Sequence, residues 1–348
     1  MEKNQKITIC SVSYNSWDLL KLNYELVSRL NEENSNWTWV IVNNGMKPTP
    51  NCHPFLRNPK CFITDGDQLN ARLPLEYRGS FHHGVGLNKS LSHVRTRFGL
   101  FLDPDFFIVF GQNWINSIVD HMLQNDLSFF GPPWHPKWYV KYRYFPCPHC
   151  VFIDLKKIPI ESLDFTPDYE INHFSKVKKL KRSKRDSVKE PMTSASNNEK
   201  GFRPIKNFNR FMKKLSISKR KRSIGWSRDT GFKIYWKYGH NPKVKYDGPI
   251  PVYKLYSNAI REGFIASPLN RLFELFLPDR LTYIPKRSHL YSRKSFRDLG
   301  YPNIDGLGWE EFLWKGKPFG FHLRSQRFLS PKNISKESLI KAILLRFV

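Results

Sequence analysis

Two carboxylates, Asp103 and Asp105, follow an apolar, aromatic run of five residues. They belong to the stretch 98–110, F-G-L-F-L-D-P-D-F-F-I-V-F. The run predicts a buried strand that delivers both aspartates to one edge of a sheet. Two like charges beside apolar residues repel and lose hydration unless a positive body lies between them, and a divalent metal ion is the usual one. A metal ion held there can bind a diphosphate. Asp-Pro-Asp is also ordinary turn chemistry, so a simple turn is the alternative.

The residues before this pair alternate between strand and helix patterns. Strands are predicted at 6–14, 37–42 and 61–64, and the first is followed by helix-start residues and an amphipathic stretch. Such βαβ units close right-handed with parallel strands, so the carboxyl ends of the strands meet at one crevice. We therefore expect an α/β fold with polar residues at successive strand ends. These residues are Ser13, Tyr14, Asn15, Asn43, Asn44 and Asp65.

A glycine-rich stretch at 79–91, G-S-F-H-H-G-V-G-L-N-K-S-L, precedes the aspartate pair. Glycines permit close approach of the backbone, and a helix that begins near Leu87 or Asn88 would direct amide groups at a phosphate. The side chains of His82, His83 and Asn88 could hydrogen-bond a ligand. A plain loop is the alternative for these glycines.

The motifs named so far resemble a known family. V-S-Y-N, V-I-V-N-N-G, G-x-x-x-x-G-x-G-x-N and F-L-D-P-D-F occur in order over residues 6–110. Together they resemble the nucleotide-sugar half of a GT-A glycosyltransferase, and they are most similar to family 2 enzymes. The resemblance implies a Rossmann-like, mostly parallel central sheet flanked by helices, with a basic insertion and a C-terminal extension. The implied parts are a nucleotide-sugar-binding half (1–110), an acceptor-binding and catalytic half (111–170 and 224–325), the insertion (171–223) and an amphipathic C-terminal helix (326–348).

The resemblance also implies an activity. The expected reaction is metal-dependent transfer of a sugar from a nucleotide-diphosphate sugar to a hydroxyl of a glycan or lipid-linked acceptor. It would be hexosyltransferase-like (EC 2.4) and inverting, in the synthesis of cell-surface polysaccharide or glycoconjugate. Mn²⁺ or Mg²⁺ would be bound by Asp103, Asp105 and His322, with Asp105 as the direct ligand.

Roles for further residues follow from the same resemblance. Asp229 would be the catalytic base, although an N-cap is its alternative, and a structural histidine is the alternative for His322. Two positions depart from the family pattern: many relatives have Asp at the position of Asn43, and Arg228 replaces the usual Glu before the base. The residues expected to bind the nucleotide sugar are Ser13, Tyr14, Asn15, Asn43, Asn44, Asp65, His83, Asn88, Asp103 and Arg324.

The chain carries a net charge of +27, which implies an acidic partner. Residues 176–222 hold 18 Lys or Arg against three acidic residues. We expect this segment to bind an anionic membrane, and a solvated loop is its alternative. Because no signal peptide or apolar segment of spanning length is found in the sequence, a cytoplasmic, peripherally membrane-associated protein is expected. A nucleic-acid-binding protein is the alternative function, but strand ends rich in aspartate would repel phosphate, so no nucleic acid is expected.

An aromatic run and two of the cysteines follow the aspartate pair in the chain. The aromatic run from Trp134 to Phe145 suits either a carbohydrate platform or a packed core. Cys147-Pro148-His149-Cys150 resembles the redox motif of thioredoxin-fold oxidants, but the next residues predict a strand rather than the helix that activates such a thiol. A zinc site that adds Cys52, His53 or Cys61 would match no common spacing. We therefore expect structural, reduced cysteines, with a thiol oxidoreductase as a third function class.

Overall fold

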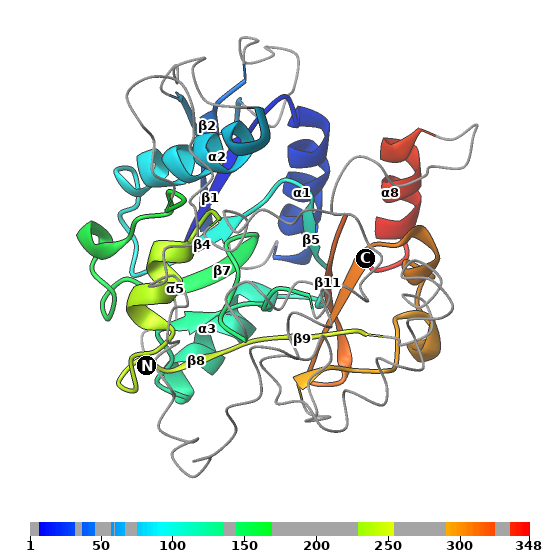
Figure 1. The fold of residues 1–348 in the computed structure, drawn as a ribbon. Coiled ribbons are helices and arrows are strands. Elements are labelled where there is room, and N and C mark those ends of the chain that lie inside the picture. Colours follow the sequence, from blue (N-terminus) through cyan, green and yellow to red (C-terminus); the bar gives the residue numbers. More distant parts are fainter. Residues whose placement is uncertain are drawn as a thin grey trace, which may run out of the picture.

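The computed structural model describes residues 7–31, 37–45, 57–58, 60–66, 75–135, 144–168, 229–253, 290–323 and 335–348. Within these ranges a seven-stranded sheet has the order β3-β2-β1-β4-β7-β6-β8 (Figure 1). Strands β3, β2, β1 and β4 are parallel, β7 is antiparallel to β4 and β6, and β8 is parallel to β6. The strands are β1 (Ile7–Ser13), β2 (Trp37–Asn43), β3 (Cys61–Asp65), β4 (Phe98–Leu102), β6 (Phe129–Phe130), β7 (Cys150–Asp154) and β8 (Tyr246–Asp247). The predicted α/β class with a mostly parallel central sheet is confirmed.

A second sheet, entirely antiparallel, contains four strands among the described residues in the order β5-β11-β10-β9. These strands are β5 (Phe106–Ile108), β9 (Ile250–Pro251), β10 (Glu310–Trp314) and β11 (Lys317–His322). The chain leaves β4 in the first sheet and enters β5 in the second after only three residues, 103–105. The aspartate pair therefore lies where the two sheets meet. The sequence predicted the first strand of this pair but not the second sheet.

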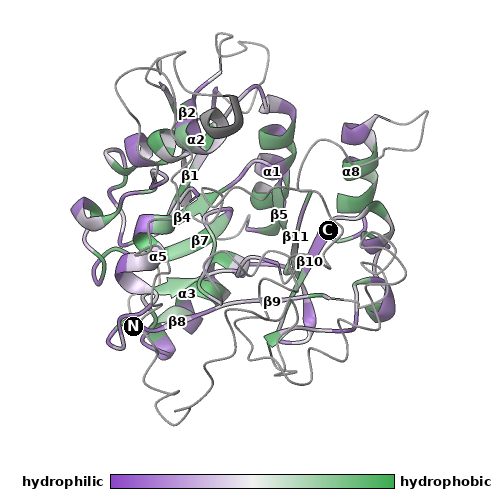
Figure 2. Cartoon of the chain, in the orientation of Figure 1, coloured by the Kyte–Doolittle hydropathy of each residue, from purple (hydrophilic) through white to green (hydrophobic). Residues whose placement is uncertain are grey.

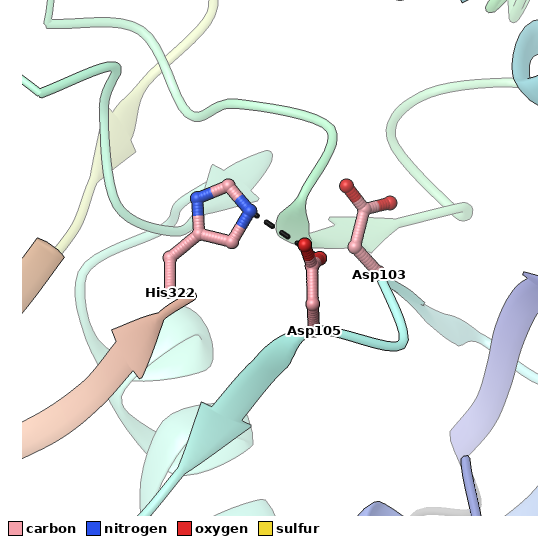
Figure 3. A group of neighbouring side chains, drawn as sticks. All are labelled: Asp103, Asp105 and His322. Carbon is pink, nitrogen blue, oxygen red and sulfur yellow. Dashed lines mark ion pairs between the residues drawn. The ribbon is translucent and has the colours of Figure 1, made fainter. Parts of the chain in front are cut away.

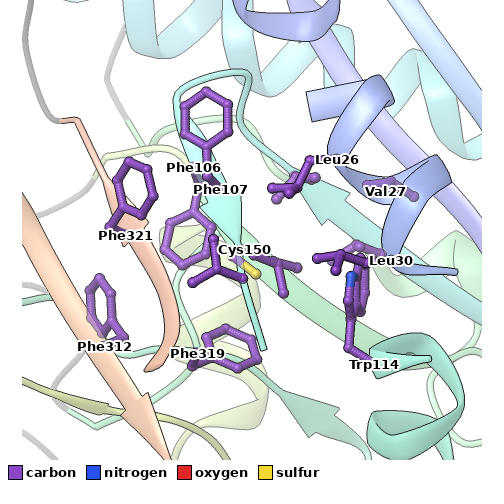
Figure 4. Packing of buried hydrophobic residues seen from close by; sticks show 14 of the residues in the cluster. Leu26, Val27, Leu30, Phe106, Phe107, Trp114, Cys150, Phe312, Phe319 and Phe321 are labelled. Atoms are coloured by element: carbon purple, nitrogen blue, oxygen red, sulfur yellow. The ribbon is translucent and has the colours of Figure 1, made fainter. Parts of the chain in front are cut away.

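The helices are α1 (Trp17–Leu30), α2 (Leu75–Leu91), α3 (Trp114–Gln124), α5 (Phe232–Tyr238) and α8 (Lys336–Leu344). Apolar residues three, four and seven apart place Leu20, Val27 and Leu30 on one buried face of α1. This face packs toward the second sheet, where Figure 4 shows Phe106 and Phe107 of β5 between α1 and strand β11. Burying one phenylalanine stabilises a fold by about 1.5–3 kcal/mol, so these side chains hold helix and sheet together.

Helix α8 packs on the body of the protein. Ser335 caps its first turn by accepting a hydrogen bond from the backbone N–H of Ser338 (3.1 Å), and Ile340, Ile343 and Leu344 are buried in the same core as α1. Figure 2 shows apolar and polar residues mixed along this short helix, as one buried face requires. The amphipathic C-terminal helix implied by the sequence is thus present over Lys336–Leu344 and packs on the domain. Across the described ranges, no helix combines the length and the apolar character that crossing a bilayer requires.

Helix α2 starts earlier than the sequence predicted. It begins at Leu75, so the glycine-rich stretch lies inside the helix and its amide groups are used within it, which contradicts a helix entry near Leu87. The glycines serve close packing instead. A Cβ atom on Gly84 would lie 2.6 Å from the carbonyl oxygen of Phe165, and one on Gly86 would lie 2.8 Å from the side chain of Val12. The helix can approach Phe165 at Gly84 and β1 at Gly86 this closely only because these two residues lack a side chain.

Candidate metal centre

The turn that carries Asp103 and Asp105 is fixed by backbone hydrogen bonds to separate elements. The N–H of Asp103 donates to the carbonyl oxygen of His149, just before β7, at 2.9 Å. The carbonyl oxygen of Asp105 accepts from the N–H of Leu323, just after β11, at 3.0 Å. Asn23 of α1 donates from Nδ2 to the carbonyl oxygen of Pro104 at 2.8 Å. Asp-Pro-Asp is thus a turn, as the alternative proposed, and the turn holds its carboxylates in fixed positions.

Strand β11 brings a third side chain to this turn. Ligand atoms of Asp103, Asp105 and His322 all lie within 4.8 Å of one another. His322 Nε2 is 3.3 Å from Asp105 Oδ1, as Figure 3 shows. Two carboxylate oxygens and one imidazole nitrogen suit a divalent cation such as Mn²⁺, which also binds phosphate oxygens. The three residues that the sequence nominated as ligands are therefore brought together by the fold.

The charges at this group reinforce one another. Burial lowers the pKa of His322, but the carboxylates of Asp105 and Glu310 outweigh burial and raise it to about 9. Burial raises the pKa of Asp105, but His322 and, more weakly, Lys336 of α8 lower it by more. Asp105 is thus ionised at neutral pH, and a metal ion at this group would take the place of the His322 proton that faces Asp105.

His83 and Asp229 belong to the same electrostatic group. His83 Nε2 lies 2.9 Å from Asp103 Oδ1. Burial lowers the pKa of His83, but the negative charges of Asp103, Asp229 and Asp105 raise it overall. Helix α2 and the turn before α5 therefore bring these two predicted residues to the side of the aspartate pair.

Asp229 lies in the turn that precedes α5, and Gly231 occupies the N-cap position of that helix at φ 81°. The Asp229 carboxylate instead accepts a hydrogen bond from the N–H of Thr230 at 2.8 Å. Thr230 in turn donates from Oγ1 to the carbonyl oxygen of Ser80 in α2 at 2.9 Å. The simple N-cap alternative for Asp229 is wrong, and the base assignment remains a prediction.

Polar residues predicted to border the nucleoside lie at the carboxyl ends of three parallel strands. The strand registers place Ser13 beside Asn43 and Asn43 beside Asp65. Ser13 and Asn43 are buried, whereas Asp65 is exposed. Asn43 Nδ2 donates to Asp65 Oδ1 over a long distance of 3.4 Å, which orients both side chains. A row of polar groups thus lines this edge of the sheet.

The turn after β1 adds two exposed residues to that edge. The side chain of Tyr14 is 59% exposed, and Asn15 adopts a left-handed backbone conformation with φ 56°. Asn residues tolerate this conformation better than most others. Both side chains are accessible to a ligand.

Two other residues predicted to bind the nucleotide sugar use their side chains for hydrogen bonds within the protein. Asn44 donates from Nδ2 to the carbonyl oxygen of His82 in α2 at 2.6 Å. Asn88 donates from Nδ2 to Asp164 Oδ1 (2.9 Å) and accepts from the N–H of Phe165 (2.8 Å). The side-chain amides of these two residues connect secondary-structure elements, so neither residue belongs to the nucleotide-sugar site proposed below. Arg324 lies outside the described residues, as do residues 171–223.

The cysteine motif does not form a reactive site. Cys147 and Cys150 are buried and free of disulfides, and Cys150 starts β7 beside Leu102. Burial, with a contribution from Asp103, raises the pKa of Cys150 well above its usual value. The thiol of Cys150 is therefore not activated to a thiolate, and both cysteines are buried, as expected of structural thiols. Cys52 and His53 of the zinc alternative lie outside the described residues.

Part of the aromatic run belongs to the core. Phe145 is buried and packs against Phe129 with ring centroids 5.0 Å apart. Trp138, Tyr139 and Tyr142 lie outside the described residues. For Phe145 the packed-core interpretation is the one that the structure supports.

Sequence reasoning did not single out Glu310 or His149 as site residues. Glu310 Oε2 is 3.2 Å from His322 Nδ1, and the His149 ring stacks on the His322 ring with centroids 4.7 Å apart. The hairpin turn Lys315-Gly316 between two aromatic segments indicates that these two segments pair, but it does not give the register that places Glu310 opposite His322. No comparable local signal points to His149.

Comparison with known proteins gave partial likenesses. No family model and no curated protein matches the sequence. Among solved structures, residues 1–349 of TarS from S. aureus in complex with UDP-GlcNAc match at TM-score 0.36 and 12% identity, over 49% of this chain and 51% of that chain. The mannosyltransferase PcManGT from Pyrobaculum calidifontis, in complex with GDP-Man and Mn²⁺, matches at TM-score 0.32 and 11% identity, over 45% of this chain and 48% of that chain. This chain thus covers about half the length of each solved chain, and likenesses this partial support no conclusion about its activity.

Proposed function

We propose that this protein is a metal-dependent glycosyltransferase that moves a sugar from a nucleotide-diphosphate sugar to a hydroxyl group of a glycan or lipid-linked acceptor. The observation that carries the proposal is the group of Asp103, Asp105 and His322 at the carboxyl end of β4. The same edge of the parallel sheet presents Ser13, Asn43 and Asp65 in one row, so nucleoside and diphosphate can be bound side by side.

Each part of the site has a distinct task in the proposed reaction. Asp103, Asp105 and His322 would hold Mn²⁺ or Mg²⁺, and His83 contacts Asp103 from the side of α2. When bound, the ion supplies positive charge that stabilises the departing nucleoside diphosphate. Ser13, Tyr14, Asn15, Asn43 and Asp65 would border the nucleoside.

Asp229 acts as the general base in the proposed chemical step. The acceptor oxygen forms a bond to the anomeric carbon while the bond from that carbon to the phosphate oxygen breaks, and Asp229 takes the proton from the acceptor hydroxyl. The nucleoside diphosphate leaves with the electron pair. A single displacement of this kind inverts the anomeric configuration.

The acceptor and the location of the enzyme belong to the same proposal. We infer that the acceptor is part of a cell-surface polysaccharide or glycoconjugate and that residues 176–222 bind the anionic face of a membrane on the cytoplasmic side. The support is the excess of 18 basic over three acidic residues in that segment. The nucleic-acid-binding alternative depends on these same residues, and no contact among the described residues favours it.

The experiment that tests the function is a thermal-shift panel of nucleoside diphosphates with and without Mn²⁺. A ligand that binds the folded state raises the melting temperature, so at least one diphosphate should do so only when Mn²⁺ is present. Asp105→Ala should lose this metal-dependent shift while keeping a cooperative melt. If no diphosphate shifts the wild-type protein, or if the Asp105→Ala protein responds as the wild type does, the proposed metal-dependent function is wrong.

A further inference from the structure

Three strands of the second sheet place a carboxylate, an imidazole and the aspartate turn in one row. In the register of β10 and β11, Glu310 lies directly opposite His322. In the register of β11 and β5, His322 lies opposite Phe106, which follows Asp105 in the chain. The fold therefore places His322 between two acidic residues that come from different strands.

A carboxylate faces each nitrogen of the His322 ring. Nε2 lies 3.3 Å from Asp105 Oδ1, and Nδ1 lies 3.2 Å from Glu310 Oε2. Asp105 belongs to the candidate metal ligands and Glu310 does not. Glu310 is 1% exposed, so it acts on the ring from the protein interior and not from the side where ligands enter.

Aromatic side chains restrict the same ring. His149 stacks on His322 with an interplanar angle of 24°, and the Phe106 ring lies 5.9 Å away by centroids. His149 is itself stacked on Phe106, with centroids 5.2 Å apart. Rotation of the His322 ring would disturb these packed neighbours, so the direction of each nitrogen is determined by the fold.

We propose that Glu310 is a positioning residue for the metal centre: its carboxylate accepts the hydrogen bond from Nδ1–H of His322 and so directs the lone pair of Nε2 toward the metal ion. A histidine ligand needs its second nitrogen protonated and oriented in this way. A buried carboxylate is unfavourable unless hydrogen bonds satisfy it, and the Nδ1–H group provides such a bond. The inference rests on the proposed function only in requiring that a divalent metal binds at Asp103 and Asp105.

The neighbouring Glu311 provides a matched control. It is equally buried, at 2% exposed, but its carboxylate accepts hydrogen bonds from the backbone N–H groups of Phe296 (2.9 Å) and Asp305 (3.0 Å). Consecutive residues of a strand point to opposite faces of the sheet, which explains the different partners. Glu311 therefore supports the fold and has no contact with His322 among the described hydrogen bonds.

The test measures binding of Mn²⁺ alone to the full chain from the electron paramagnetic resonance signal of the free ion. A nitrogen ligand is detected from the ¹⁴N modulation of the spin-echo signal of the bound ion. Glu310→Leu should weaken Mn²⁺ affinity about 10- to 100-fold, the usual effect of losing such a partner, and should diminish the ¹⁴N modulation. Glu310→Gln retains an oxygen that can accept the Nδ1–H bond, so its loss should be smaller. Glu311→Gln should lower the melting temperature but change Mn²⁺ affinity by less than about twofold.

The outcomes separate this inference from the function on which it rests. Wild-type protein that binds no Mn²⁺, or binds it without ¹⁴N modulation, would overturn the metal centre itself. Wild-type protein that shows both signals, with Glu310→Leu and Glu310→Gln equal to it in affinity and modulation, would overturn the positioning role alone. Circular dichroism of each variant confirms that the fold is retained. If the leucine variant does not fold, Glu310→Met, whose flexible side chain also lacks an acceptor oxygen, takes its place with the same expected loss.

Discussion

Asp229 would act as the general base, the role on which the proposed sugar transfer depends most. Its position relative to the aspartate pair follows from its electrostatic effect on His83. Its negative charge helps to raise the pKa of His83, so it lies on the side of the turn that carries Asp103. One carboxylate oxygen accepts from the N–H of Thr230, which fixes its orientation before any acceptor binds. A carboxylate held in this way is suited to removing a proton from a hydroxyl group that enters from outside.

We expect Asp229→Asn to separate binding from turnover. The amide keeps the size of the side chain but cannot take up a proton, so turnover should fall by roughly 10²-fold or more while affinity for the donor is unchanged. Initial rates of sugar transfer and donor binding by calorimetry measure the two quantities. Equal turnover in the two proteins would leave Asp229 with a structural role only, and Thr230→Val is a control that disturbs the same turn without removing the base.

At the scale of elements, Asp164 connects α2 to α5. Its carboxylate accepts hydrogen bonds from Lys233 of α5 (2.6 Å) and from Asn88 of α2 (2.9 Å). Burial raises the pKa of Asp164, but hydrogen bonds from Lys233, Thr166 and Asn88 outweigh it and lower the pKa to about 2. Because α2 carries His83 and the turn before α5 carries Asp229, this link aligns two candidate site residues.

Because the pKa of Asp164 is lowered in the folded protein, the stability contributed by this residue decreases as the pH falls. A carboxyl group with a lower pKa in the folded state contributes stability that is fully present above its unfolded pKa, about 4, and is lost as the pH falls toward about 2. The wild type should therefore be more stable than Asp164→Asn at pH 6, and this difference should shrink as the pH falls to 3. Urea unfolding midpoints of both proteins across this range measure it.

Lys233→Gln is the matching control for this prediction. It removes the hydrogen bond that lowers the pKa of Asp164 most, so it should reduce the pH dependence of the difference without removing the carboxylate. A difference between wild type and Asp164→Asn that stays constant from pH 6 to pH 3 would contradict the assignment.

Strand ends could be predicted from the sequence because the pattern is local. Residues 37–43 and 98–102 are apolar runs followed directly by polar residues, and both are parallel strands in the structure. Asp103 and Asp105 could be placed at the end of such a strand for the same reason, which made them candidate ligands. The start of α2 could not be predicted from the sequence, because the glycines at 84 and 86 make contacts with residues far away in the sequence.

The partner of His322 was hidden by an irregularity in β11. A regular two-residue turn at Lys315-Gly316 pairs Trp314 with Lys317, and continuing that register would place Glu310 opposite Phe321. The register shifts between Phe312 and Leu313, so Glu310 faces His322 instead. The carbonyl oxygen of Phe319, in the shifted stretch, accepts from the N–H of Val109, just after β5, at 2.8 Å. A one-residue shift reverses which side chains share a face.

For the whole molecule, the uneven charge is the feature with the largest expected effect on location. Each Lys or Arg close to an anionic leaflet contributes about 1 kcal/mol, so a fraction of the basic residues in 176–222 would hold the protein at a membrane. We expect deletion of residues 176–222 to release the protein from anionic vesicles and to weaken transfer to a lipid-linked acceptor. Slow hydrolysis of the donor by water should be retained, since the candidate metal ligands lie elsewhere in the chain.

Co-sedimentation with vesicles of increasing phosphatidylserine content measures the release, and binding to duplex DNA at the same salt concentration is the comparison. Vesicle binding by the deletion variant equal to that of the full chain would refute the membrane role of the segment. Loss of DNA binding without loss of vesicle binding would favour the nucleic-acid alternative.

The position of β11 at the centre of the second sheet has a consequence for biosynthesis. β5 is made early, but its hydrogen-bonding partner β11 and the candidate ligand His322 are made roughly 200 residues later, which at 5–20 residues per second is a delay of about 10–40 s. During that interval the strand Phe106-Phe107-Ile108 lacks β11, its one neighbour among the described strands, and an apolar unpaired strand edge is prone to aggregation. Nascent chains halted before residue 317 should therefore depend on chaperones more strongly than the finished protein does.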